Sequence, residues 1–204
     1  MNSPINSKFR ISKCLNICVF ASGGGGNLKY LIERQDSTLF EISCLVVDVR
    51  CGAESVAAQY DVPVLKIESR DGKLNFDQLA DTEKIINSDI IILAGFMPIV
   101  PRLFIKQYGK LMLNTHPSLL PKHGGKGMYG VSVQESVIKS GDLIAGCTCH
   151  IVDEGIDTGR IICQSQISVD TNLSPWELGG QVFLLEGPNL LNALNIVKEK
   201  MEKG

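Results

Sequence analysis

Residues 15–27 read LNICVFASGGGGN, an apolar run that leads directly into four consecutive glycines. The apolar part, residues 15–21, has the length and composition of a buried strand. The glycines predict a tight turn, and Leu28, Leu31 and Ile32 then recur at the spacing of one helix face. This stretch therefore predicts a strand, a turn and a helix in immediate succession, which is how a parallel α/β sheet begins.

The same alternation continues through the first half of the chain. Apolar runs typical of strands are separated by segments whose apolar residues recur at helical spacing. We expect strands at 15–21, 42–49, 62–67 and 90–93 and from 111 into Asn114, and helices at 53–60, 76–87 and 101–108. This order predicts an α/β fold with a doubly wound, mostly parallel sheet and flanking helices.

The second half indicates a different ending. Residues 145–152 and 161–169 alternate as strands do and predict a late antiparallel extension of the sheet. Before them, 122–130 form a glycine-rich loop, and a helix around 133–138 ends at Gly141. Ser174 and Glu177 form a capping box, so a helix starts there, and Pro188 is expected to kink or split it before 190–198.

Length and charge limit the classes of function. We assign residues 15–204 to a single domain and expect 1–14 to be a flexible N-terminal extension. The net charge is −2 with no basic tract, which argues against nucleic acid as a partner. No apolar stretch approaches the ~20 residues of a membrane span, and the run at 15–21 is too short for a signal peptide. We expect a cytoplasmic protein.

The cysteines indicate reduced thiols and no metal site. Their number is odd, and most lie in apolar strand-like runs, at positions 14, 18, 44, 51, 147, 149 and 163. A secreted disulfide framework is therefore not expected. Cys147 and Cys149 have neither the CxxC spacing nor a second ligand pair, so we predict no metal.

Residues 114–121 read NTHPSLLP and contain candidate groups for acyl transfer. Asn114 and His116 project to the same side of an extended strand, and Pro117 keeps His116 extended. An amide can stabilise an oxyanion and an imidazole can carry a proton. A hydrogen-bonded turn without catalytic function is the alternative. A carboxylate from the turn-rich segment 150–159 could complete the set, and both Asp153 and Asp157 are candidates.

Three stretches in this order carry a family resemblance: LAGFM at 93–97, LNTHPSLLP at 113–121 and DEGIDTG at 153–159. They resemble the folate-dependent formyltransferases, most closely those acting on glycinamide ribonucleotide in purine biosynthesis, from about residue 16 to about 197. The resemblance implies a Rossmann-like fold and formyl transfer from 10-formyltetrahydrofolate to the amine of glycinamide ribonucleotide. It places Asn114, His116 and Asp157 at the catalytic positions, and it implies a cis peptide bond before Pro121.

The resemblance also implies residues that bind the folate. Met97, Ile99 and Val100 match positions that line the slot for the pterin, with Asn114 beside them and the loop that begins at Val152 as another wall. The alternative for the three apolar residues is an ordinary core position. Arg70 is expected to meet the glutamate tail of the folate.

For the second substrate, the resemblance assigns the phosphate to Gly25, Gly26 and Asn27 and the ribose hydroxyls to Glu186. Many relatives carry Ser in place of Gly26, so phosphate binding is expected to be weaker or more flexible. Some carry a polar residue in place of Phe183, which leaves the contacts on that side of the substrate pocket open. Taken alone, the loop could be a simple turn, and Glu186 could be a solvated carboxylate. A dinucleotide-binding fingerprint fails because Leu28 and Lys29 stand where its third glycine is required.

Other functions stay open at this stage. Within the family they are formyltetrahydrofolate hydrolase, methionyl-tRNA formyltransferase and sugar-nucleotide formyltransferase. We place them second because the chain ends about where a catalytic domain would end and is not basic. From a different class, a non-catalytic nucleotide-binding module is possible. His123 and Lys126, on the glycine-rich loop, are candidate lid residues, but we expect them to be simply solvated. We expect a monomer or a homodimer.

Overall fold

The computed structural model describes residues 14–70 and 73–203. The N-terminal extension expected at 1–14 therefore lies, except for Cys14, outside the described residues. Within the described ranges, no helix combines the length and the apolar character that crossing a bilayer requires.

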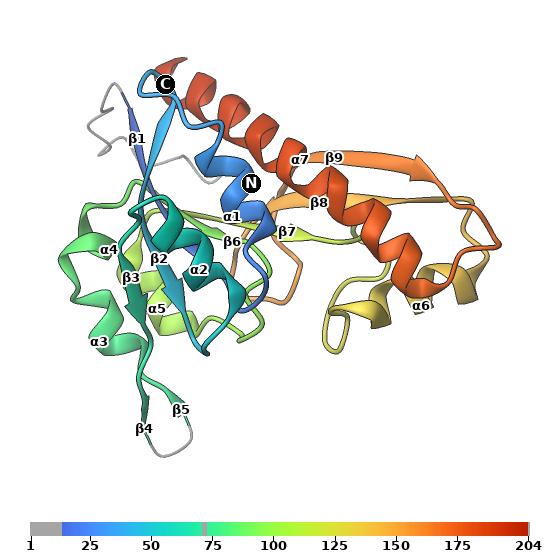
Figure 1. Ribbon diagram of the computed structural model, residues 1–204, viewed down its shortest axis with the longest axis horizontal. Coiled ribbons are helices and arrows are strands. Elements are labelled where there is room, and N and C mark those ends of the chain that lie inside the picture. The colour runs from blue at the N-terminus through green and yellow to red at the C-terminus, as the bar shows by residue number, and fades with distance from the viewer. Residues whose placement is uncertain (1–13, 71–72, 204) are drawn as a thin grey trace.

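A seven-stranded sheet forms the centre of the molecule (Figure 1), with the strand order β3-β2-β1-β6-β7-β8-β9. Its strands are β1 Leu15–Phe20, β2 Phe40–Val47, β3 Val64–Lys66, β6 Ile90–Leu93, β7 Leu111–His116, β8 Ile144–Ile151 and β9 Ile161–Ser168. Neighbouring strands from β3 to β7 are parallel, whereas β8 and β9 pair antiparallel. The predicted fold class, a mostly parallel doubly wound sheet with a late antiparallel extension, is confirmed.

The helices cover both faces of the sheet (Figure 1). They are α1 Gly26–Ile32, α2 Gly52–Gln59, α3 Phe76–Ala80, α4 Glu83–Asn87, α5 Arg102–Tyr108, α6 Val131–Ser140 and α7 Pro175–Lys203. Buried residues of α1, α2 and α7 pack on one face, and those of α3, α4 and α5 pack on the other.

Strand β1 shows why this sequence forms a central strand. Ile17 and Val19 point into the core under α1 and α7, whereas Cys18 and Phe20 point into the core under α3 and α5. All four side chains are fully buried. A strand that is covered on both faces must be apolar throughout, as the sequence of residues 15–21 is. Burial of one large apolar side chain stabilises the fold by about 1.5–3 kcal/mol.

Two predictions about helices are wrong in detail. The helix expected at 76–87 is divided into α3 and α4, because Thr82 adopts an extended conformation and serves as the N-cap residue of α4. Of the kink or split expected at Pro188, the split does not occur, because α7 is one helix of 29 residues. The helix can tolerate Pro188 for a simple reason. Proline has no N–H to donate to the carbonyl of Leu184, but Leu184 lies on the exposed side of the helix, where water can donate instead.

A small hairpin was not predicted. Strand β4, Ser69–Arg70, pairs antiparallel with β5, Lys73–Leu74, in a separate two-stranded sheet. The peptide bond between Leu120 and Pro121 is cis, as the resemblance implied.

The antiparallel pairing of β7 with β8 determines which side chains meet at the carboxyl end of β7. Asn114 lies opposite His150, and His116 lies opposite Thr148. The loops that follow β1 and β6 reach the same edge of the sheet, since parallel strands end together. This edge carries the candidate site.

Candidate active site

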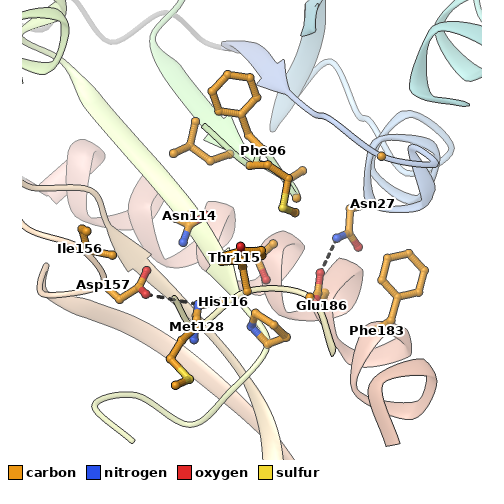
Figure 2. Close-up of a pocket in the computed structure, with 18 of the residues that line it drawn as sticks. Asn27, Phe96, Asn114, Thr115, His116, Met128, Ile156, Asp157, Phe183 and Glu186 are labelled. Atoms are coloured by element: carbon orange, nitrogen blue, oxygen red, sulfur yellow. Dashed lines mark hydrogen bonds and ion pairs between the residues drawn. The ribbon is translucent and has the colours of Figure 1, made fainter. Parts of the chain in front are cut away.

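A cavity of about 900 Å³ opens at this edge. Its walls come from the glycine loop before α1, the segment after β6, the end of β7, the loop before α6, the loop after β8 and the first turns of α7. Figure 2 shows side chains from these segments pointing toward a common space. The cavity lies near the upper end of the usual volume range of ligand pockets, so it has room for more than a small metabolite.

Asn114 is oriented by a residue that sequence reasoning missed. Its side-chain nitrogen Nδ2 lies 3.0 Å from Nε2 of the buried His150. Nδ1 of His150 is 2.9 Å from the carbonyl of Ile151 and therefore carries the proton, because a carbonyl can only accept. In the tautomer with its proton on Nδ1, Nε2 is the acceptor for the amide of Asn114. One amide N–H is thus fixed on His150, and the second remains available for a ligand in the cavity.

His116 is almost fully buried beside Asn114. Its Nε2 donates to the carbonyl of His123 over 2.9 Å, and its Nδ1 lies 3.6 Å from Oδ2 of Asp157. Burial lowers the pKa of His116, although the negative charge of Asp157 acts in the opposite direction. The imidazole is therefore neutral at pH 7, and its unprotonated Nδ1 faces the carboxylate.

Asp157 reaches the site from the loop between β8 and β9. It adopts a left-handed backbone conformation, φ 57°, which is uncommon for residues other than glycine. Oδ2 accepts from the main-chain N–H of Gly125 over 2.9 Å, and Oδ1 lies 3.6 Å from Nε2 of His150. Burial raises the pKa of Asp157, but the rings of His150 and His116 and the Gly125 N–H outweigh it and leave the pKa lowered. The carboxylate is therefore ionised.

The two other acidic residues of this loop lie apart from the imidazole of His116. Asp153 accepts from the N–H of Gly155 and the hydroxyl of Thr158, and so shapes the turn. Glu154 is exposed and pairs with Lys106 over 3.1 Å. Of the two aspartates that local sequence left open, Asp157 is the one whose carboxylate lies near the imidazole of His116.

Glu186 is buried and bonded. Its Oε2 accepts from Nδ2 of Asn27 over 2.6 Å, as Figure 2 shows, and the solvated-carboxylate interpretation is therefore wrong. Burial raises the pKa of Glu186 to about 7, although the bond from Asn27 acts against this. The pair joins the start of α1 to α7 at the side of the cavity opposite Asp157.

Gly26 and Phe183, the two departures from the family pattern, lie against each other in the structure and depend on each other. A Cβ on Gly26 would lie 2.4 Å from Cζ of Phe183, which is far inside van der Waals contact. The ring of Phe183 thus occupies the space that a side chain at position 26 needs. Gly25 is constrained as well, because it has φ 79° and its Cβ would lie 2.7 Å from Cα of Ala53.

The apolar residues assigned to the folate slot all line the cavity. Met97 and Ile99 are 56% and 69% exposed, so the alternative of an ordinary core position does not hold for them, whereas Val100 is buried. Val152 lines the cavity from the segment after β8. The main chain of Arg70 lies in β4, and its side chain is outside what the structure describes.

His123 was expected to be solvated, and this expectation is wrong. Its side chain is only 10% exposed, and both ring nitrogens have partners. Lys126 is exposed at the rim of the cavity, as expected. Within residues 14–70 and 73–203, no group of three or more His, Cys, Asp or Glu side chains is placed to hold a metal ion.

Comparison with known proteins places this chain in a family. Residues 15–194 match the formyl transferase family, described as "Formyl transferase". The chain belongs to this family. A similar curated protein is the chloroplastic phosphoribosylglycinamide formyltransferase of Arabidopsis thaliana, 37% identical over 82% of this chain and 60% of its own length. The trifunctional purine biosynthetic protein adenosine-3 of Chironomus tentans is 34% identical over 88% of this chain and 13% of its own length.

Solved structures agree with the family assignment. A phosphoribosylglycinamide formyltransferase from Anaplasma phagocytophilum superposes with a TM-score of 0.82 at 28% identity, covering 92% of this chain and 89% of that one. A glycinamide ribonucleotide transformylase from Symbiobacterium toebii gives 0.81 at 25% identity, over 93% and 90%. The chain spans 55–60% of the length of the two plant relatives that it matches.

Proposed function

We propose that this chain transfers the formyl group of 10-formyltetrahydrofolate to the primary amine of glycinamide ribonucleotide. The observation that carries the proposal is the convergence of an amide, a neutral imidazole and an ionised carboxylate at one wall of the large cavity. Asn114, His116 and Asp157 come from two distant segments, which the β7–β8 pairing brings side by side. The names of the relatives, phosphoribosylglycinamide formyltransferase among them, support the choice of substrates.

In the proposed mechanism, Asn114 stabilises the negative charge that develops on the formyl oxygen when the amine adds, and His116 contributes once its Nδ1 has taken up the amine proton. Asn114 supplies the amide N–H that His150 leaves available. Nδ1 of His116 takes a proton from the attacking amine, and Asp157 stabilises the imidazolium that results. The His116–Asp157 pair then returns the proton, through water, to the folate nitrogen that leaves.

The two ends of the cavity have different chemistry. The apolar wall of Met97, Ile99, Val100 and Val152 suits a flat pterin ring, and we assign the folate to it. Opposite, the glycine loop at Gly25 and Gly26 offers main-chain N–H groups to a phosphate. Asn27 and Glu186 stand beside this loop, where the carboxylate can accept from ribose hydroxyls. No side-chain hydroxyl is available at position 26, and we expect phosphate binding to depend on the main chain.

The test is the turnover of purified Asn114→Ala with both substrates. Removal of one oxyanion donor lowers kcat by about 10²–10³-fold in other enzymes, and we expect a loss in this range with an unchanged melting temperature. Asn195→Ala is the matched control, since Asn195 is exposed on α7. Wild-type turnover in Asn114→Ala would refute the assignment. Formyl loss from the folate that does not require the amine would instead indicate a hydrolase.

A further inference from the structure

A chain of hydrogen bonds runs behind the catalytic wall, outside the cavity. The ring of His123 lies between two side chains: Nδ1 is 2.8 Å from the hydroxyl of Ser136 on α6, and Nε2 is 2.9 Å from Oδ2 of Asp142 beyond the end of α6. Lys122 adds a bond to the other oxygen of Asp142 over 2.9 Å. We call Ser136, His123 and Asp142 the rear clamp. His123 and Asp142 border a separate hollow of about 500 Å³.

The rear clamp connects to the site through the main chain. The carbonyl of His123 is the partner of His116 Nε2, and Gly125, two residues further on, gives its N–H to Oδ2 of Asp157. One short loop segment therefore holds both members of the acid–base pair. The hydroxyl of Ser118 supports this segment by donating to the carbonyl of Lys122 over 2.7 Å.

The backbone at this point requires an external hold. His123 has φ 53°, in the left-handed region that residues other than glycine rarely adopt. Such a conformation persists where the surroundings determine it, and here the side chain is fixed at both ring nitrogens. The bond from His123, and then that from Lys122, lower the pKa of Asp142 to about 2, so the clamp keeps an ionised carboxylate at physiological pH.

From this geometry we infer that the rear clamp is a positioning device for catalysis: it holds the carbonyl of His123 against His116 and so keeps the proton of the neutral imidazole on Nε2. Nδ1 is then the atom left to exchange protons beside Asp157. A neutral histidine has two tautomers, and the fixed partner of one nitrogen decides which is populated. Without the clamp, the loop segment relaxes toward ordinary backbone angles, the carbonyl withdraws, and both tautomers become populated. The effect on turnover rests on the proposed function, whereas the tautomer itself does not.

The experiment combines nitrogen NMR with kinetics. The chain has three histidines, so long-range ¹H–¹⁵N spectra of protein labelled at histidine are simple to assign. We expect wild-type His116 to be Nε2–H only, and His123→Phe and Asp142→Asn to contain both tautomers. Because misplaced catalytic groups lose rate and not affinity, kcat should fall by about tenfold or more while both KM values stay within about twofold.

Controls separate positioning from damage to the fold. Glu135→Gln alters an exposed neighbour on α6 and should change neither the His116 tautomer nor kcat. Asp142→Glu keeps the carboxylate and should retain most of the kcat that Asp142→Asn loses. If His123→Phe does not fold, Ser136→Ala is a milder alternative that removes one hydrogen bond to His123. A His116 signal that remains purely Nε2–H in Asp142→Asn and Ser136→Ala would overturn the inference, as would a mixed signal with unchanged kcat. If the variants change the His116 tautomer but the wild-type protein shows no formyl transfer, the clamp is supported and the proposed function is refuted.

Discussion

The contact between Gly26 and Phe183 allows a sharp test of the cavity wall. Replacement of Gly26 by Ser would place a Cβ 2.4 Å from the tip of the Phe183 ring, and ordinary contact begins at 3.4 Å. The obstacle is the far end of one side chain and not main chain. We therefore expect Ser at position 26 to be accommodated by displacement of the ring, with α1 left in place.

The magnitude follows from the burial of that ring. Phe183 is 45% exposed, so about half of its surface is removed from water. Full burial of a phenylalanine is worth about 1.5–3 kcal/mol, and displacement of the half-buried ring should therefore cost about 1 kcal/mol. In a Phe183→Ala background the obstacle is gone. There Gly26→Ser should be neutral or stabilising by a few tenths of a kcal/mol, because Ser restricts the unfolded chain more than Gly does.

Urea unfolding followed by circular dichroism measures all four proteins of this double-mutant cycle. We expect a coupling free energy of about 1 kcal/mol between the two substitutions, which corresponds to about 2–4 °C in Tm for a chain of this length. Gly24→Ser is the matched control, since a Cβ there would meet no atom within 4 Å. If Gly26→Ser costs the same with and without the ring, Phe183 is not the obstacle and the steric argument is refuted.

Two further predictions concern stability. The folded-state pKa of Glu186, about 7, lies above its ordinary value of 4.5, so the folded state binds this proton more tightly than the unfolded state does. The unfolding free energy of wild type should therefore fall, relative to Glu186→Gln, as the pH rises from 4.5 to 7, and a flat difference in urea titrations across this range would contradict the assignment. Gly146→Ala places a Cβ 2.0 Å from the carbonyl oxygen of Ser165 and should cost about 1–3 kcal/mol or more in the same assay. Gly180→Ala, in open space on α7, should stabilise by about 0.5–1 kcal/mol, and equal effects at both glycines would count against the packing argument.

The sheet could be predicted because the apolar pattern within each strand's own sequence indicates that the strand is buried. Residues 90–93, four apolar residues in a row, coincide with β6, and the alternation at 145–152 matches β8 within one residue at each end. The division between α3 and α4 was not readable from spacing. Ile85 is buried and Ile86 is 56% exposed, so the break at Thr82 rotates the second helix and changes which isoleucine meets the core. The β4–β5 hairpin has no apolar alternation to reveal it.

Prediction of the site was limited because strand register and tertiary contacts, which bring distant segments together, are not encoded in local sequence patterns. Asn114 and His116 share a strand, and their common direction follows from a period of two. The role of His150 depends on the register between β7 and β8, which the sequence does not give, although the pairing of two polar residues on neighbouring apolar strands was a usable signal. The burial of His123 and Glu186 was missed for the same reason, because each is covered by side chains from a remote helix or loop.

The long helix α7 has a consequence for how the pocket opens. Its second half is embedded among the most protected side chains of the molecule, including Leu190 and Leu194, and its first half carries Phe183 and Glu186 into the cavity. Amide protons on the buried part of this wall should exchange only when the whole protein unfolds, whereas residues 126–130 opposite, beyond the part of the loop that the rear clamp holds, can open on their own. The pocket thus has one rigid wall, helix α7, and one wall that can deform, this part of the glycine-rich loop. Adaptation to a differently shaped ligand would come from the loop.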